Sequence, residues 1–271
     1  MPEIKTSVSS QVFYHKMGSG PAMVLLHGFP ECCSLWRNVW DELSRSFTLI
    51  IPDMPGIGRT VLSGPTSLSR MAEMVSEIMD YEGIATAVVA GHSMGGYISL
   101  AFARAFPHKV AGIALVHSMS DADDAEKRKL RSKTIELVKK GGKELFMKEM
   151  VPNLFADSFR SANPLVISEQ VAEAIKMDAE SVINFYTAIR ERDDNRPVLN
   201  SAAYPVMWVA GLQDNVIDYK KILPECYRSA VNFVSFYSDC GHMSMIEAPT
   251  ELINDLEQFG QYCYHKYSTG A

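Results

Sequence analysis

The stretch Gly91-His92-Ser93-Met94-Gly95-Gly96 decides the fold of this chain. It follows the apolar run Ala87–Ala90 and precedes an apolar stretch at 94–106, so it occupies a turn between a strand and a helix. A nucleophile exposed on such a turn has a strained backbone and needs neighbours without side chains. The flanking glycines meet that need. We therefore predict that Ser93 is a nucleophile and that Met94, which follows it, begins a helix packed against a sheet.

Short apolar runs on both sides of this junction predict the sheet itself. They are rich in Val and Ile and continuous rather than alternating, which indicates strands covered on both faces. The runs lie at 12–16, 22–26, 48–51, 87–90, 112–116, 206–210 and 232–237. The first two flank Gly18-Ser19-Gly20 and are predicted to pair as a hairpin.

Helical patterns separate these runs, at 35–46, 68–81, 94–106, 217–229 and 251–264. Alternation of strands and helices favours an α/β domain with a mostly parallel central sheet and helices on both faces. The fold class predicted from the sequence is therefore α/β.

The segment 119–203 contains helical patterns and no convincing strand. We predict a first helix capped by Ser120, with Asp121, Asp123 and Asp124 in its first turn. Further helices are expected at 142–151, 168–177 and 179–190. The domain organisation is accordingly a core formed by 1–118 and 204–271, with 119–203 as an inserted helical cap, or lid.

A second motif, His27-Gly28-Phe29-Pro30, ends the run at 23–26. Acyl transfer develops negative charge on a carbonyl oxygen, and two backbone N–H groups aimed at that oxygen stabilise it. We assign these donors, the oxyanion hole, to Phe29 and Met94. His27 is interpreted as a structural residue of this loop.

A third motif, Asp239-Cys240-Gly241-His242, follows the last apolar run. A serine hydroxyl needs a neutral imidazole as its base, and His242 is the one histidine at the end of a late strand beside a glycine. His117 is expected near the site without acting as base. Cys240 could also lie nearby.

The acid that orients this histidine is predicted to be Asp214, in the loop after the run at 206–210. The order Ser93, Asp214, His242 is the one that a G-x-S-x-G elbow uses. Asp218, Asp239 and Asp121 are rivals for the role. Asp53 is interpreted as a residue that holds its own loop together.

Composition excludes several classes of function. The 271 residues carry a net charge of −6 with a pI near 5.7 and no basic stripe, so nucleic acid is not an expected partner. No apolar run is long enough to span a membrane, and no signal pattern precedes the first strand, so a cytoplasmic location is expected. The five cysteines have no disulfide or zinc-site spacing and are interpreted as reduced, mostly apolar side chains.

Together these motifs resemble the α/β-hydrolase superfamily, from Val12 to about Tyr264. The resemblance implies an α/β-hydrolase fold in which 119–203 forms the lid. The loop His27–Glu31 is also similar to that of epoxide hydrolases and haloalkane dehalogenases, where a cis bond often precedes the proline, so Phe29–Pro30 is a candidate for one. Those enzymes attack with an aspartate; the serine at position 93 favours ester-type substrates.

The expected function is cofactor-free and metal-free hydrolysis of a small-molecule ester of a small or medium, apolar acid. Apolar residues that could line its pocket, or be plain core, are Phe29, Met94, Met243, Phe146, Leu154, Phe155 and Phe185. Alternatives are perhydrolysis or haloperoxidase-like oxidation, C–C bond hydrolysis on the same triad, and a slow-turnover small-molecule receptor. The sequence does not indicate the oligomeric state.

Overall fold

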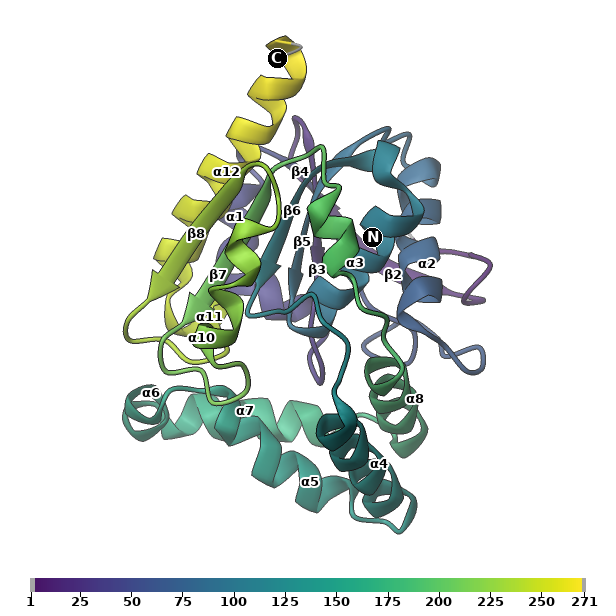
Figure 1. Cartoon of the computed structure of the whole chain (residues 1–271). Coiled ribbons are helices and arrows are strands. Elements are labelled where there is room, and N and C mark those ends of the chain that lie inside the picture. The colour runs from purple at the N-terminus through teal and green to yellow at the C-terminus, as the bar shows by residue number, and fades with distance from the viewer. Residues whose placement is uncertain (1–2, 270–271) are drawn as a thin grey trace.

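The computed structural model describes residues 3–269, and within them one eight-stranded sheet forms the centre of the molecule (Figure 1). The strand order is β1-β2-β4-β3-β5-β6-β7-β8, with β1, β2 and β4 joined by antiparallel pairing and all later pairs parallel. The strands are β1 (Glu3–Ile4), β2 (Val12–Met17), β3 (Ala22–Leu26), β4 (Thr48–Pro52), β5 (Ala87–His92), β6 (Val110–Val116), β7 (Val206–Gly211) and β8 (Asn232–Tyr237).

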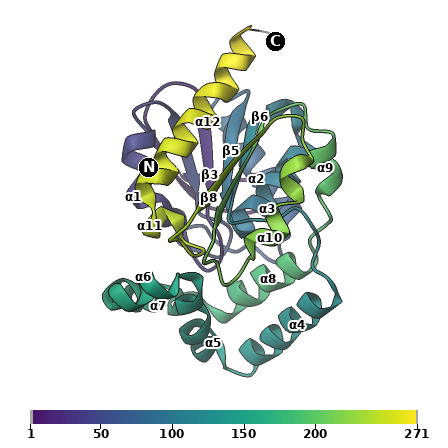
Figure 2. The same ribbon diagram turned by 60° about the vertical axis from the view of Figure 1, so that its left-hand side comes forward.

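Two layers of helix cover the sheet, α1 and α12 on one face and α2, α3 and α10 on the other (Figure 2). This is the arrangement expected of an α/β-hydrolase fold. The helices outside the segment 119–203 are α1 (Arg37–Leu43), α2 (Leu68–Tyr81), α3 (Met94–Ala105), α10 (Tyr219–Ile222), α11 (Ser244–Glu247) and α12 (Pro249–Thr269), with short 3-10 turns at Cys33–Trp36, Pro107–Lys109 and Glu225–Tyr227. No described helix is long and apolar enough to cross a membrane.

Burial follows the apolar patterns. Every residue of β3, β5, β6 and β7 is buried, because each of these strands has a parallel neighbour on both sides and helices above and below. β8 forms one edge of the sheet and is only half-buried. The continuous apolar runs are thus explained by a two-sided core, as expected for parallel sheets.

The predicted hairpin of β2 with β3 is wrong. β4 lies between them, antiparallel to β2 through Tyr14–Pro52 and parallel to β3 through Val24–Ile50. Pairing with β4 lets β3 have parallel neighbours on both sides, which suits its fully buried sequence. The turn at Gly18 and Gly20 therefore joins two strands that do not pair.

Within the described residues, no strand interrupts the chain between β6 and β7. The helices there are α4 (Ala125–Lys139), α5 (Lys143–Met150), α6 (Asp157–Ala162), α7 (Pro164–Ile175), α8 (Ala179–Arg190) and α9 (Arg196–Asn200), with a 3-10 turn at Val151–Leu154. Helices α4 to α8 lie together beyond one end of the sheet (Figure 1). Ser93, which directly follows β5, lies at that end of the sheet.

Two helix predictions need correction. The first helix of this segment is capped by Asp124, whose Oδ1 accepts the Lys127 N–H at 2.8 Å, and it begins four residues after Asp121. Ser120 instead donates its hydroxyl to Glu225. The expected helix at 217–229 is broken into α10 and a 3-10 turn, with Pro224 between them.

Candidate active site

Ser93 stands on a sharp turn between β5 and α3, as the sequence predicts. Its φ of 50° is in the left-handed region, which costs a non-glycine residue free energy. A Cβ on Gly91 would lie 2.2 Å from the Gly95 carbonyl carbon, and one on Gly95 would lie 2.2 Å from the Leu26 oxygen. Only glycine therefore fits on either side of this serine.

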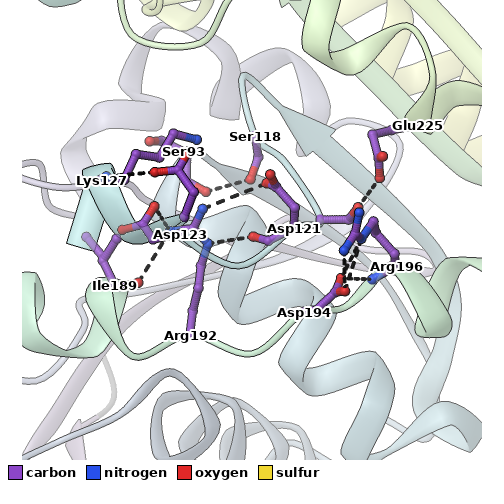
Figure 3. A network of polar contacts seen from close by, with 12 residues as sticks. Ser93, Ser118, Asp121, Asp123, Lys127, Ile189, Arg192, Asp194, Arg196 and Glu225 are labelled. Carbon is purple, nitrogen blue, oxygen red and sulfur yellow. Dashed lines mark hydrogen bonds and ion pairs between the residues drawn. The ribbon is translucent and has the colours of Figure 1, made fainter. Parts of the chain in front are cut away.

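The Ser93 backbone is held in place by β6 and the loop after it. Its N–H donates to the Val116 carbonyl at 2.9 Å, and its own carbonyl accepts the Ser118 hydroxyl at 2.8 Å (Figure 3). The residue remains partly exposed. The strained turn is thus fixed from both sides without complete burial of Ser93.

Asp214 and His242 lie in hydrogen-bond contact. Nδ1 of His242 is 2.7 Å from Oδ2 of Asp214, and both side chains are almost completely buried. The other oxygen of Asp214 accepts the N–H groups of Val216 and Ile217 at 2.7 and 2.9 Å. One carboxylate oxygen is thus fixed by its own loop, which aims the other at the imidazole.

The two groups shift each other's protonation. Burial alone would raise the pKa of Asp214, but the neighbouring His242 and His117 hold it well below its usual range. Burial would lower the pKa of His242, but the attraction of Asp214 outweighs it and raises that pKa above the ordinary 6.5. Asp214 is therefore ionised, and the imidazole beside it is made more basic.

The rivals of Asp214 are engaged elsewhere. Asp121 lies 3.9 Å from Arg192, at the end of α8, in a network that also contains Asp123 (Figure 3). Asp218 caps α10, and Asp239 accepts the neighbouring Ser238 hydroxyl. Within the described residues, none of the three contacts His242.

His117 is a second imidazole on the same carboxylate, with Nδ1 3.4 Å from Asp214 Oδ2. The Gly211 N–H donates to this Nδ1 at 3.3 Å, and burial lowers the pKa of His117. With a longer contact to Asp214 and a lowered pKa, His117 is a weaker proton acceptor than His242. Its position beside the site agrees with the sequence interpretation.

No hydrogen bond joins Ser93 Oγ to His242 among the described side chains. Catalytic contacts of this kind are often long without substrate and tighten when it binds. The ring of His92, the residue before Ser93, lies 4.9 Å from the His242 ring, and its Nε2 is 2.9 Å from the His242 carbonyl. The serine turn and the histidine loop are therefore adjacent.

The N–H groups of Phe29 and Met94 have no acceptor within the described chain. Both residues are buried, Phe29 after the end of β3 and Met94 at the first position of α3. The first N–H groups of a helix point outward along its axis and lack intrahelical partners. Neither amide is therefore engaged by another described group.

Two loop residues have the structural roles expected of them. His27 donates from Nδ1 to the Gly28 carbonyl at 2.7 Å and accepts the Met54 N–H on Nε2 at 2.9 Å. Asp53 accepts the N–H groups of Cys33 and Arg59, both at 2.8 Å. The Phe29–Pro30 bond is cis, as the resemblance implied.

Three residues escaped the sequence analysis. Glu247 accepts three backbone N–H groups, from Gly241 and Met243 around His242 and from Ala156 across the gap to the helical segment. Glu31 and His92 lie beside His242 with buried polar atoms. Glu31 and His92 lie inside motifs that were assigned to other residues, and no pattern in the sequence gives any of the three a role; their tertiary contacts reveal it.

A cavity of about 1160 Å³ opens beside the site, between the core and α7. Pro30, Glu31 and Met243 line it on the core side, and Leu154 and Phe155 line it from the helical segment. Phe146 and Phe185 do not: the Phe185 ring packs 6.0 Å from that of Phe29, and the Phe146 ring packs 5.3 Å from that of Tyr186. Of the proposed pocket residues, Leu154, Phe155 and Met243 meet the cavity.

Two clusters in the described chain have ligand atoms close enough to hold a metal ion. One is His117, Asp214 and His242, and the other is Cys32, Cys33 and Asp53. In the cluster of His117, Asp214 and His242, the hydrogen bond between Asp214 and His242 already explains why the side chains lie close together. In the second, both carboxylate oxygens accept backbone N–H groups. None of the five cysteines forms a disulfide in the described chain, and four of them are buried.

Comparison with known proteins gives the family. A model of the α/β-hydrolase fold matches residues 21–249. The dihydrolipoyllysine-residue acetyltransferase component of the acetoin cleaving system of Cupriavidus necator is 29% identical over 252 residues, covering 88% of this chain. The chain spans about 63% of that protein's length.

Two further comparisons span nearly the whole length of both proteins. The pimeloyl-(acyl-carrier protein) methyl ester esterase of Edwardsiella ictaluri is 27% identical over 245 residues, covering 88% of this chain and 89% of the relative. The structure of a thermophilic esterase from Thermogutta terrifontis superposes with a TM-score of 0.91 at 24% identity, covering 97% and 98% of the two chains. The chain belongs to the α/β-hydrolase fold family.

Proposed function

We propose that this chain is a serine hydrolase that cleaves carboxylic esters through an acyl-enzyme. The observation that carries the proposal is the buried contact of 2.7 Å between Asp214 and His242, next to a serine on a strained turn. A carboxylate in this position fixes the imidazole tautomer and stabilises the imidazolium that forms. Two relatives with similar chains, from Edwardsiella and Thermogutta, are described as esterases.

The proposed reaction has two steps. His242, its Nδ1–H held by Asp214, takes the Ser93 proton on Nε2 as the serine oxygen attacks the ester carbonyl. The amides of Phe29 and Met94 donate to the oxygen that becomes negative. His242 then protonates the leaving alcohol. In the second step His242 takes a proton from water as the water oxygen attacks the acyl carbonyl, and it returns that proton to Ser93 Oγ as the bond to the acid breaks.

The cavity supports a substrate with an apolar acyl or alcohol group. Its apolar lining residues include Leu154, Phe155, Met243 and Ile246, and its volume of about 1160 Å³ exceeds what a small ester fills. Arg37, Lys176 and several carboxylates also line it. A medium-length acid with a polar far end fits this lining better than a short acid does.

We propose that 119–203 acts as a lid over this cavity. Two contacts support this role: Leu154 accepts the His242 N–H at 2.7 Å, and Ala156 donates to Glu247 at 2.9 Å. The segment thus contacts the histidine loop directly. A change in the position of α7 would alter access to the site while leaving β5 and β7 in place.

The test is a panel of p-nitrophenyl esters with acyl chains of increasing length, followed to many turnovers. An esterase releases product continuously, with a maximum of kcat/KM at a medium chain length. A receptor with a residual triad would give one burst of product equal to the enzyme concentration. Absence of turnover on every ester, together with cleavage of a β-diketone or peracid formation from peroxide, would replace the ester assignment.

A further inference from the structure

Glu31 is a partly buried residue beside the proposed site, and the proposed mechanism does not use its carboxyl. It follows the cis proline of the loop that carries the Phe29 amide, and its side chain lines the cavity. Its Oε2 is buried and has no hydrogen-bond partner. An unpaired buried carboxylate is strongly disfavoured, so this group needs either a proton or a partner.

His92 carries the matching unpaired atom. Its Nε2 faces the His242 carbonyl at 2.9 Å, and a carbonyl can only accept, so Nε2 bears the hydrogen. Burial, aided by the nearby His242 and His117, lowers the pKa of His92 well below 6.5, so the ring is neutral. Its Nδ1 therefore presents a lone pair, and this atom has no partner.

The two unpaired atoms flank the same point. A Cβ built on Gly28 would lie 2.6 Å from His92 Nδ1 and 3.2 Å from Glu31 Oε2. The two atoms do not bond to one another in this structure, so a protonated carboxyl would reach this lone pair through one water molecule. An ionised carboxyl would face the lone pair with a second one, which is repulsive.

We propose that Glu31 is a positioning residue that works as a neutral carboxylic acid directed at His92, and that loss of its proton stops turnover. The inference rests on the proposed ester hydrolysis and concerns the same site. Glu31 does not touch the reacting atoms; it links the loop of the Phe29 amide, through His92, to the backbone of His242.

Burial supports this protonation state. It raises the pKa of Glu31 to about 7, against the opposing attraction of His242. The titratable groups that face Glu31 are His242 and His92 on the strand-end loops and Cys32 on its own segment. The other charged residues that line the cavity are Arg37, Glu169, Glu173, Lys176 and Asp178.

Ionisation of Glu31 would act against each step of hydrolysis. A carboxylate on this loop opposes the negative charge that forms at the Phe29 amide. It also favours the charged form of His242, whose pKa it raises, and this form cannot accept the serine proton. Glu31 and His242 therefore titrate as a coupled pair, and only the state with both groups neutral is active.

The test compares pH profiles of kcat/KM for wild type and Glu31→Gln on an aryl ester. Wild type should give a bell-shaped profile, with activity falling about tenfold per pH unit above about 7. Glutamine is neutral at every pH and keeps a donor. E31Q should therefore lose the alkaline limb, and its acid limb should move to lower pH.

Two variants separate this role from simple packing. Glu31→Leu is neutral but has no donor; it should also lack the alkaline limb, with a plateau lower than that of E31Q. Glu136→Gln, an exposed carboxyl of α4 paired with Lys139, should keep the wild-type bell. An alkaline limb that persists in E31Q and E31L, or a wild type without one, overturns the proposal.

A measurement independent of turnover covers the case in which the proposed function fails. Infrared difference spectra between pH 6 and pH 9 should contain the C=O band of one protonated carboxyl that E31Q lacks. Absence of this difference overturns the role of Glu31 whether or not esters are cleaved. Its presence without ester turnover retains the neutral carboxyl and rejects only the serine-hydrolase assignment.

Discussion

Replacement of Asp214 by Asn tests the role of this carboxylate with little change in shape. Asn Oδ1 can still accept the N–H groups of Val216 and Ile217, which now lie 2.7 and 2.9 Å from Asp214 Oδ1. The amide NH2 then takes the place of Oδ2, 2.7 Å from His242 Nδ1. A donor at that point forces the imidazole to carry its proton on Nε2, where the mechanism needs a lone pair.

The expected loss follows from this wrong tautomer. The equivalent change in a serine protease triad lowers kcat by about 10⁴. At about 1.4 kcal/mol per factor of ten, this corresponds to about 5.5 kcal/mol of transition-state stabilisation. Asn has the shape of Asp and can keep the hydrogen bonds to Val216 and Ile217. We therefore expect only a small change in melting temperature.

The assay is kcat/KM on p-nitrophenyl acetate for wild type, Asp214→Asn and Asp121→Asn. Asp121 lies 3.9 Å from Arg192 and is partly exposed, so its amide variant should stay within about threefold of wild type. A loss below tenfold for Asp214→Asn in a folded protein would refute the tautomer argument. A greater loss for Asp121→Asn would move the acid to the loop after β6.

The remaining expectations concern the base, the metal and the cavity. Because His242 must be neutral and its pKa is raised, the acid limb of kcat/KM should lie above pH 6.5; activity that falls steadily from pH 5 would exclude this base. EDTA should leave kcat unchanged, and inhibition reversed by zinc would contradict the serine mechanism. Phe155→Ala should shift acyl-chain preference toward longer esters, since Phe155 lines the cavity. Phe155 and Phe185 are both fully buried, so each alanine variant should cost about 3–5 kcal/mol of stability in denaturant unfolding; a shift of chain preference in Phe185→Ala and none in Phe155→Ala would put Phe185 in the pocket instead.

The fold could be predicted because its strongest signals are local. The glycines around Ser93 are required because a side chain at those positions would clash. The apolar runs of β5, β6 and β7 are required because every residue in them is buried. Strand pairing is not local. The turn between β2 and β3 resembles a hairpin connection, but the insertion of β4 depends on which neighbours bury β3 best.

The same distinction holds for the site. Ser93, Asp214 and His242 each follow the carboxyl end of a recognisable strand, so the parallel sheet brings them to the same edge. Glu31 and Glu247 were missed because their burial and partners come from segments far apart in sequence. The predicted start of α4 was wrong because Ser120 and Asp124 are both residue types that cap helices. Only the tertiary contact of Ser120 with Glu225 excludes Ser120 as the cap.

The most direct test of the account is fluorophosphonate labelling followed by peptide mapping. Such a probe reacts with a serine only when a base and an oxyanion hole activate it. We expect a single adduct on Ser93 in wild type, and neither adduct nor ester hydrolysis in Ser93→Ala, whose residual rate should be about 10⁶-fold lower. Labelling at another residue, or hydrolysis that survives in Ser93→Ala, would contradict the central claim that Ser93 is the nucleophile.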